Sequence, residues 1–182
     1  MNVLIAFGTT EGQTRKIARH LSETIDGLGH SATLFDSGGD AAGAAVASFD
    51  AVILAASVHH ERYQTAFYEF VKDNREALQA KPRAFISVSL SQTLAGGEPE
   101  AQRYVDGFVA ETGLSFDQVH LAEGAIRYFE YSRSEADTIE LIVFKGQKKM
   151  PKAGGNPEYT DWEALDAFAK KFLTDVARSI PL

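Results

Sequence analysis

Short runs of apolar residues alternate along the chain with stretches in which apolar residues recur at three- and four-residue spacing. The short runs predict strands over Asn2–Phe7, Ala32–Phe35, Ala51–Ala56, Arg83–Leu90 and Gln118–Ala122. Several of these runs contain no alternating polar residues, which is typical of strands buried on both faces of a parallel sheet. Strands that alternate with helices predict a parallel sheet covered by helices on both sides.

The longer stretches predict helices with one apolar face. The first helix begins at Gln13 and is ended by Gly27. Two further helices are predicted over Gln64–Ala80 and Pro99–Thr112. The alanine-rich segment Asp40–Ser48 predicts a weak helix.

The last part of the chain is less regular. Ser134–Phe144 fits either a helix or a strand, and the capping-like spacing at its start, with a glycine after its end, favours a helix. Thr160 and Glu163 form a clearer capping box, which predicts the start of the final helix. That helix is expected to bury one apolar face, made of Leu165, Phe168, Phe172 and Val176.

The turn FGTTEGQT (Phe7–Thr14) lies between the first predicted strand and the first predicted helix. The unpaired N–H groups and the dipole at a helix start favour an anion at this position. A nucleoside-triphosphate loop would carry lysine after its last glycine, but Gly12 is followed by Gln13. A dinucleotide loop would need a third glycine, and this turn has two.

The same turn suits a single terminal phosphate held by neutral donors. These donors are the hydroxyls of Thr9, Thr10 and Thr14 and the backbone amides from Glu11 to Thr14. The alternative is an N-capped helix after a tight turn, with no ligand. Five strands, the first of which leads into such a turn, favour the doubly wound order 2-1-3-4-5 of a flavodoxin-like three-layer α/β/α sandwich.

Composition narrows the class of protein. The chain has 182 residues and neither a repeat nor a linker, so we expect one domain over residues 1–182. A net charge of −7 argues against nucleic-acid binding. The absence of cysteine excludes disulfides and thiolate chemistry and suits a cytoplasmic protein. No apolar run approaches the roughly 18 residues of a membrane span, and the apolar run at the N-terminus is too short for a signal peptide.

Several stretches of this sequence together resemble one family. The stretches EGQTRKIA, ASVHHERYQTAFYEFVK, FISVSL, GAIRYFEY and YTDWE, which span Glu11–Glu163, resemble the menaquinone-dependent protoporphyrinogen oxidases, a bacterial flavodoxin-like family. The turn TTEGQT is also similar to the phosphate loop of flavodoxins, although Glu11 stands where many flavodoxins have threonine.

The resemblance implies an FMN cofactor, oxidation of protoporphyrinogen IX in heme synthesis, and a quinone as electron acceptor. By analogy with flavodoxins, the phosphate is held by Thr9, Thr10, Glu11, Gly12, Gln13 and Thr14. The isoalloxazine is flanked by the loop Ser57–Tyr63, through Ser57, Val58, His59, His60 and Tyr63. Its pyrimidine edge is covered by the loop Ser89–Gly97, through Ser89, Leu90, Ser91, Gly96 and Gly97.

Two arginines are candidates for substrate binding. Arg62 and Arg127 follow the third and fifth predicted strands, and we expect them to pair with the propionates of a porphyrinogen or with the acidic groups of another small reduced substrate. The alternative for Arg62 is a solvated loop, and for Arg127 an ion pair within the fold. Neighbouring histidines at His59 and His60 do not easily share a tetrahedral metal, so we predict no metal site.

An apolar segment, Ile139–Phe144, is followed by basic residues at Lys145, Lys148 and Lys149. Because quinones lie in the bilayer, the family resemblance implies a peripheral membrane contact, and this segment is its candidate. Acidic residues interrupt the segment, which favours a tail element packed on the sheet instead.

Two other functions stay open. The acidic net charge also fits a flavodoxin-type electron carrier without a substrate of its own, although a minimal carrier needs neither the polar loop 57–63 nor the segment Arg127–Met150. The second is a binding module that has lost the flavin.

Overall fold

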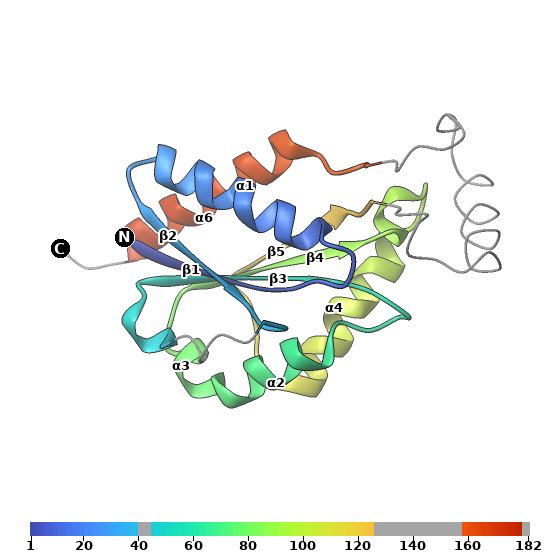
Figure 1. The fold of residues 1–182 in the computed structure, drawn as a ribbon, viewed down its shortest axis with the longest axis horizontal. Helices are drawn as coiled ribbons and strands as arrows, with labels where there is room; N and C mark the ends of the chain where they lie inside the picture. The colour runs from blue at the N-terminus through green and yellow to red at the C-terminus, as the bar shows by residue number, and fades with distance from the viewer. Residues whose placement is uncertain (40–44, 126–157, 180–182) are drawn as a thin grey trace.

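A computed structural model describes residues 1–39, 45–125 and 158–179. Five parallel strands form one sheet in the order β2-β1-β3-β4-β5, with helices on both faces (Figure 1). The strands are β1 (Asn2–Gly8), β2 (Ser31–Asp36), β3 (Ala51–Ser57), β4 (Arg83–Ser89) and β5 (Gln118–Glu123). The predicted three-layer sandwich and strand order are confirmed.

Two helix layers cover the sheet. On one face lie α1 (Gln13–Gly27) and α6 (Trp162–Ser179); on the other lie α2 (Thr65–Asp73), α3 (Arg75–Gln79) and α4 (Glu98–Thr112) (Figure 1). Because successive strand residues point to opposite faces, the sheet supplies two separate cores. The first contains Val3, Ile5, Ile17, Leu21, Phe168 and Phe172, and the second contains Leu4, Leu54, Phe67, Phe85 and Phe108.

The predicted helix over Gln64–Ala80 is broken at Asn74. The side-chain amide of Asn74 donates to the Phe70 carbonyl at 2.9 Å, a local bond that competes with continuation of the helix. Within the predicted weak helix Asp40–Ser48, the described part contains only a 3₁₀ turn over Val46–Ser48. The predicted helix Ser134–Phe144 and the basic residues after it lie outside the described residues.

The start of the final helix also differs from the prediction. Asp161, not Thr160, caps α6, because its Oδ1 accepts a hydrogen bond from the Ala164 N–H at 2.9 Å. The Thr160 hydroxyl instead donates to the carbonyl of Glu123 at the end of β5. The capping box located the start of the helix correctly but assigned the cap to the wrong residue.

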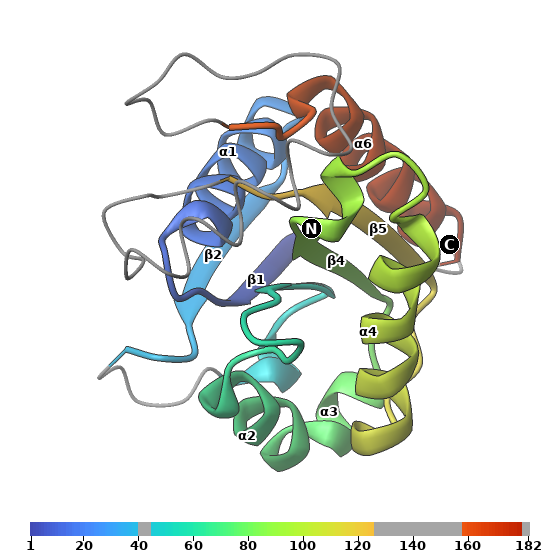
Figure 2. The ribbon, with the colours of Figure 1, turned by 90° about the vertical axis from the view of Figure 1, so that its right-hand side faces the viewer.

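The loops that follow four of the strands meet at one edge of the sheet, which Figure 2 views from the side where the strands end. The register aligns Gly8 with Ala56, Ser57 with Val88, and Ser89 with Glu123. Open α/β sheets bind ligands at this edge. Across the described ranges, no helix combines the length and apolarity required to cross a membrane.

Candidate functional site

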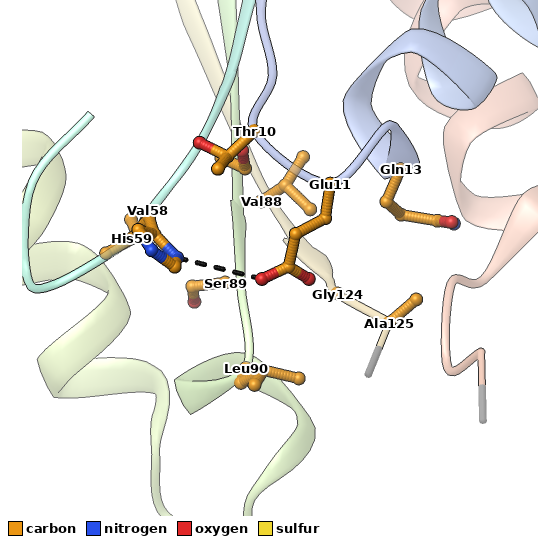
Figure 3. Close-up of a pocket in the computed structure, with 11 residues that line it drawn as sticks. Thr10, Glu11, Gln13, Val58, His59, Val88, Ser89, Leu90, Gly124 and Ala125 are labelled. Atoms are coloured by element: carbon orange, nitrogen blue, oxygen red, sulfur yellow. Dashed lines mark ion pairs between the residues drawn. The ribbon is translucent and has the colours of Figure 1, made fainter. Parts of the chain in front are cut away.

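A pocket lies at this edge, and each of the four loops contributes to its wall (Figure 3). Its lining residues are Thr10, Glu11 and Gln13 after β1, Ser57, Val58 and His59 at and after the end of β3, Val88, Ser89 and Leu90 at and after the end of β4, and Gly124 and Ala125 after β5. The structure therefore brings together predicted residues from three separate stretches of sequence. Val88, Gly124 and Ala125 were not among the predicted site residues.

The turn after β1 presents the start of α1 to the pocket. Gly12 has a φ of +86°, in the left-handed region that favours glycine, and α1 begins at the next residue. The Gly12 N–H donates to Thr9 Oγ1 at 2.9 Å, so Thr9 shapes the turn. Thr14 is fully buried, and its hydroxyl has no hydrogen-bond partner within the described residues. An unpaired buried hydroxyl beside the free N–H groups of a helix start fits an anionic ligand.

Gln64 ties the turn to the end of β3. Its Nε2 lies 2.9 Å from Thr10 Oγ1, 2.9 Å from Ser57 Oγ and 3.1 Å from the Ser57 carbonyl. A Cβ added at Gly8 would lie 2.7 Å from Gln64 Oε1 and 2.9 Å from Phe67 Cβ, so only glycine fits at this end of β1. Sequence reasoning had assigned Gln64 only to the start of a helix and missed this role.

Glu11 places a carboxylate inside the pocket. Figure 3 shows its side chain extending from the turn toward His59, and Glu11 Oε1 lies 3.7 Å from His59 Nδ1. Only 14% of the Glu11 side chain is exposed. A carboxylate is an unexpected neighbour for a phosphate, since two negative charges repel each other.

The loop after β3 contains a tight turn. His59 and Arg62 exchange two backbone hydrogen bonds of 2.8 and 3.2 Å, and the residues between them have positive φ angles, +48° at His60 and +62° at Glu61. A left-handed conformation costs a residue with a side chain about 1–2 kcal/mol. The turn leaves His59 on the pocket wall, whereas His60 does not line the pocket. Such strain is common in loops that serve a ligand site.

Tyr63 lies in the core. The ring is 4% exposed and packs against Phe85 and Phe108, with centroids 5.4 and 5.3 Å away. Its hydroxyl lies 2.8 Å from Ser87 Oγ, and burial raises the pKa of Tyr63. Tyr63 does not line the pocket, because the tight turn ends before it and its ring lies in the core with residues of α2 and α4.

Arg62 lies outside the pocket, on the side of α2 and α4. Its Nη2 is 3.0 Å from Glu111 Oε2, and its guanidinium lies 5.2 Å from the centre of the Tyr68 ring. Lys72 contacts the other oxygen of the same Glu111 carboxylate at 3.0 Å. Burial and the Glu111 charge raise the pKa of Tyr68. Arg127, the second predicted substrate residue, lies outside the described residues.

The loop after β4 divides into two parts. Ser89 and Leu90 line the pocket, and Ser89 Oγ accepts a hydrogen bond from the Gln92 N–H at 3.3 Å. Ser91, Gly96 and Gly97 do not line it. Gly97 packs its Cα against the Ser91 carbonyl, where a side chain has no room. These three residues shape the loop behind the pocket wall.

Comparisons with known proteins agree with the fold. A family model described as a flavodoxin domain matches residues 4–152. Protoporphyrinogen IX dehydrogenase (quinone) of Escherichia coli strain K12 is 32% identical over 190 residues, which cover 96% of this chain and 97% of that protein. The chain belongs to the flavodoxin-like protoporphyrinogen IX dehydrogenase family. The resemblance seen in the sequence is thereby confirmed.

Solved structures support the fold of this protoporphyrinogen IX dehydrogenase family member. Oxidised flavodoxin 1 of Bacillus cereus has a TM-score of 0.57 and 14% identity, covering 96% of this chain and 98% of that one. A Fusobacterium nucleatum flavodoxin bound to flavin mononucleotide has a TM-score of 0.52 and 11% identity, with 99% of both chains covered. The flavodoxin domain and this fold support a flavin as the cofactor. Within the described residues, no group of three or more His, Asp or Glu side chains is placed to hold a metal.

Proposed function

We propose that this protein is an FMN-dependent oxidoreductase that converts protoporphyrinogen IX to protoporphyrin IX and passes the electrons to a quinone, a step of heme synthesis. The observation that carries this proposal is the 32% identity with the Escherichia coli enzyme over nearly the full length of both chains. Coverage of 96% of this chain and 97% of that protein means that the similarity is not confined to one segment of the fold.

The residues of the pocket fit FMN better than a larger flavin nucleotide. The turn after β1 offers a single helix start, the hydroxyl of Thr10 on the pocket wall and the buried hydroxyl of Thr14, which is unpaired within the described residues, and this set suits one terminal phosphate. Val58 and His59, which follow β3, and Ser89 and Leu90, at the end of β4, line the same pocket, where they would contact a flat ring system. When bound, the flavin supplies the redox chemistry, and the protein orients it and excludes water.

The remaining assignments extend this proposal. The chain acts as a single domain, and Arg62 and Arg127 pair with the propionates of the substrate. Arg62 is 65% exposed on its side chain, which leaves its guanidinium available for exchange from Glu111 to a ligand carboxylate. The net charge of −7 argues against nucleic acid as a partner. Contact with the inner face of the cell membrane would bring the protein to a quinone that is dissolved in lipid.

Flavin titration of the apoprotein tests the cofactor assignment. We expect FMN to bind most tightly, riboflavin to bind more weakly because it lacks the phosphate, and FAD to gain nothing from its second nucleotide. A protein that binds FAD more tightly than FMN, or that binds no flavin, would contradict the proposal. An FMN-loaded protein without porphyrinogen turnover would favour the alternative of a flavodoxin-type electron carrier.

A further inference from the structure

The stretch YTDWE (Tyr159–Glu163) lies far along the chain from the turn after β1, yet the two meet in the structure. The side-chain amide of Gln13 donates from Nε2 to Thr160 Oγ1 at 2.9 Å. Gln13 is 5% exposed and Thr160 is 8% exposed, so this hydrogen bond is buried. Gln13 is the first residue of α1, where the helix start faces the pocket.

The single proton of the Thr160 hydroxyl determines which atom is the donor in the hydrogen bond with Gln13. The Thr160 hydroxyl has one proton, and it donates that proton to the Glu123 carbonyl at 2.9 Å, because a carbonyl can only accept. Thr160 Oγ1 must therefore accept from Gln13, which turns Gln13 Nε2 toward Thr160. A continuous chain of two hydrogen bonds therefore joins the first residue of α1, through Thr160, to the end of β5.

The surrounding contacts hold the same two parts of the site together. The Tyr159 N–H donates to the Gly124 carbonyl at 3.2 Å, and Glu158 forms an antiparallel bridge with Ala125. Lys16, in the first turns of α1, contacts Glu158 at 2.6 Å. Gly124 and Ala125 line the pocket, so the segment that precedes α6 joins the helix start to the part of the pocket wall that follows β5.

We propose that Thr160 is a positioning residue for the phosphate end of the cofactor, acting through Gln13. Thr160 does not line the pocket. It holds Gln13 in position, and the backbone N–H of Gln13 is the first of the free donors at the start of α1. Loss of the Thr160 hydroxyl leaves two polar groups, the buried Gln13 Nε2 and the partly buried Glu123 carbonyl, without this partner. The helix start then shifts relative to the pocket. This inference rests on the proposed FMN function.

The test compares Thr160→Val, which keeps the shape of the side chain and removes the hydroxyl, with Thr160→Ser, which keeps the hydroxyl. Affinities of the apoproteins for FMN and for riboflavin are measured by quenching of flavin fluorescence. Because only FMN carries a phosphate, we expect Thr160→Val to weaken FMN binding about tenfold and to leave riboflavin affinity within about twofold. Thr160→Ser should restore the affinity for FMN.

Thr112→Val is the matched control. Thr112 is also buried and its hydroxyl also donates to a carbonyl, that of Phe108, but it lies at the end of α4 on the other face of the sheet. This variant should lower the melting temperature of the apoprotein and leave both flavin affinities unchanged. Gln13→Met removes the same link from its other end and should reproduce the FMN-selective loss, which keeps the inference testable if Thr160→Val folds poorly.

An unchanged ratio of FMN to riboflavin affinity in Thr160→Val and Gln13→Met would overturn the inference and reduce Thr160 to a stabilising contact. An equal loss of both affinities would overturn it too. Wild-type protein that binds riboflavin as tightly as FMN, or binds neither, would instead refute the proposed cofactor. The wild-type titration therefore separates failure of the proposed function from failure of this inference.

Discussion

The Glu11 carboxylate and the His59 ring face each other across the pocket, with Oε1 and Nδ1 3.7 Å apart. Glu11 belongs to the turn that we assign to the phosphate, where its negative charge opposes a bound dianion. We predict that Glu11→Gln strengthens FMN binding by about 1 kcal/mol, or about fivefold, and leaves riboflavin affinity unchanged. Titration of the apoprotein with both flavins measures this effect. Weaker FMN binding in the variant would mean that the carboxylate accepts a bond from the cofactor.

Thr14 combines complete burial with a hydroxyl that lacks a partner within the described residues. If that hydroxyl donates to the phosphate, Thr14→Val should weaken FMN binding by about ten- to a hundredfold, because a hydrogen bond to a charged group is worth about 1.5–3 kcal/mol. Riboflavin affinity should change little, and Thr14→Ser should retain most of the FMN affinity. Equal FMN affinity in Thr14→Val and wild type would remove Thr14 from the phosphate site.

Tyr63 and Ser87 form a buried hydrogen bond in the core, away from the pocket wall. Tyr63→Phe keeps the ring and leaves Ser87 without this partner, so we expect the free energy of unfolding to fall by about 1–2 kcal/mol. FMN affinity and the quenching of flavin fluorescence should stay at the wild-type level. Denaturant unfolding and flavin titration measure the two effects. Normal stability together with lost quenching would place this ring beside the flavin.

Arg62 and Glu111 form an exposed ion pair, which in itself contributes little to stability. If Arg62 exchanges to a substrate propionate, Arg62→Met should raise the KM for protoporphyrinogen about tenfold without loss of FMN. Glu111→Gln is the matched variant, since it removes the competing carboxylate and should not raise the KM. Equal KM values in both variants and the wild type would make the pair a surface contact only.

The three central strands were predictable because each is a buried apolar run, and the strand order was predictable because strands alternate with helices along the chain. The turn between β1 and α1 was predictable because its glycines and threonines stand between an apolar run and a helical pattern. The hydrogen bond from the Gly12 N–H to the Thr9 hydroxyl within the turn was not predicted. That bond depends on the backbone conformation of the turn, and residue types alone do not determine it.

Contacts between segments that are far apart along the chain could not be predicted from the sequence. The burial of Tyr63 in the core was not predicted, since it follows a turn with positive φ angles at His60 and Glu61 that no residue type in this loop requires. The bond between Thr160 and Gln13 joins residues that no local pattern connects. The capping box predicted that the Thr160 hydroxyl caps α6, but the hydroxyl instead donates to the Glu123 carbonyl.

The central claim is tested most directly by porphyrinogen oxidation. Apoprotein is reconstituted with FMN and mixed under nitrogen with protoporphyrinogen IX and a soluble quinone, and protoporphyrin fluorescence is followed beside a protein-free control. We predict that protoporphyrin IX forms only when protein, FMN and quinone are all present, and that quinone reduction keeps pace with it. An FMN-loaded protein that exchanges electrons with quinone but forms no protoporphyrin above the control would contradict the account and leave an electron carrier.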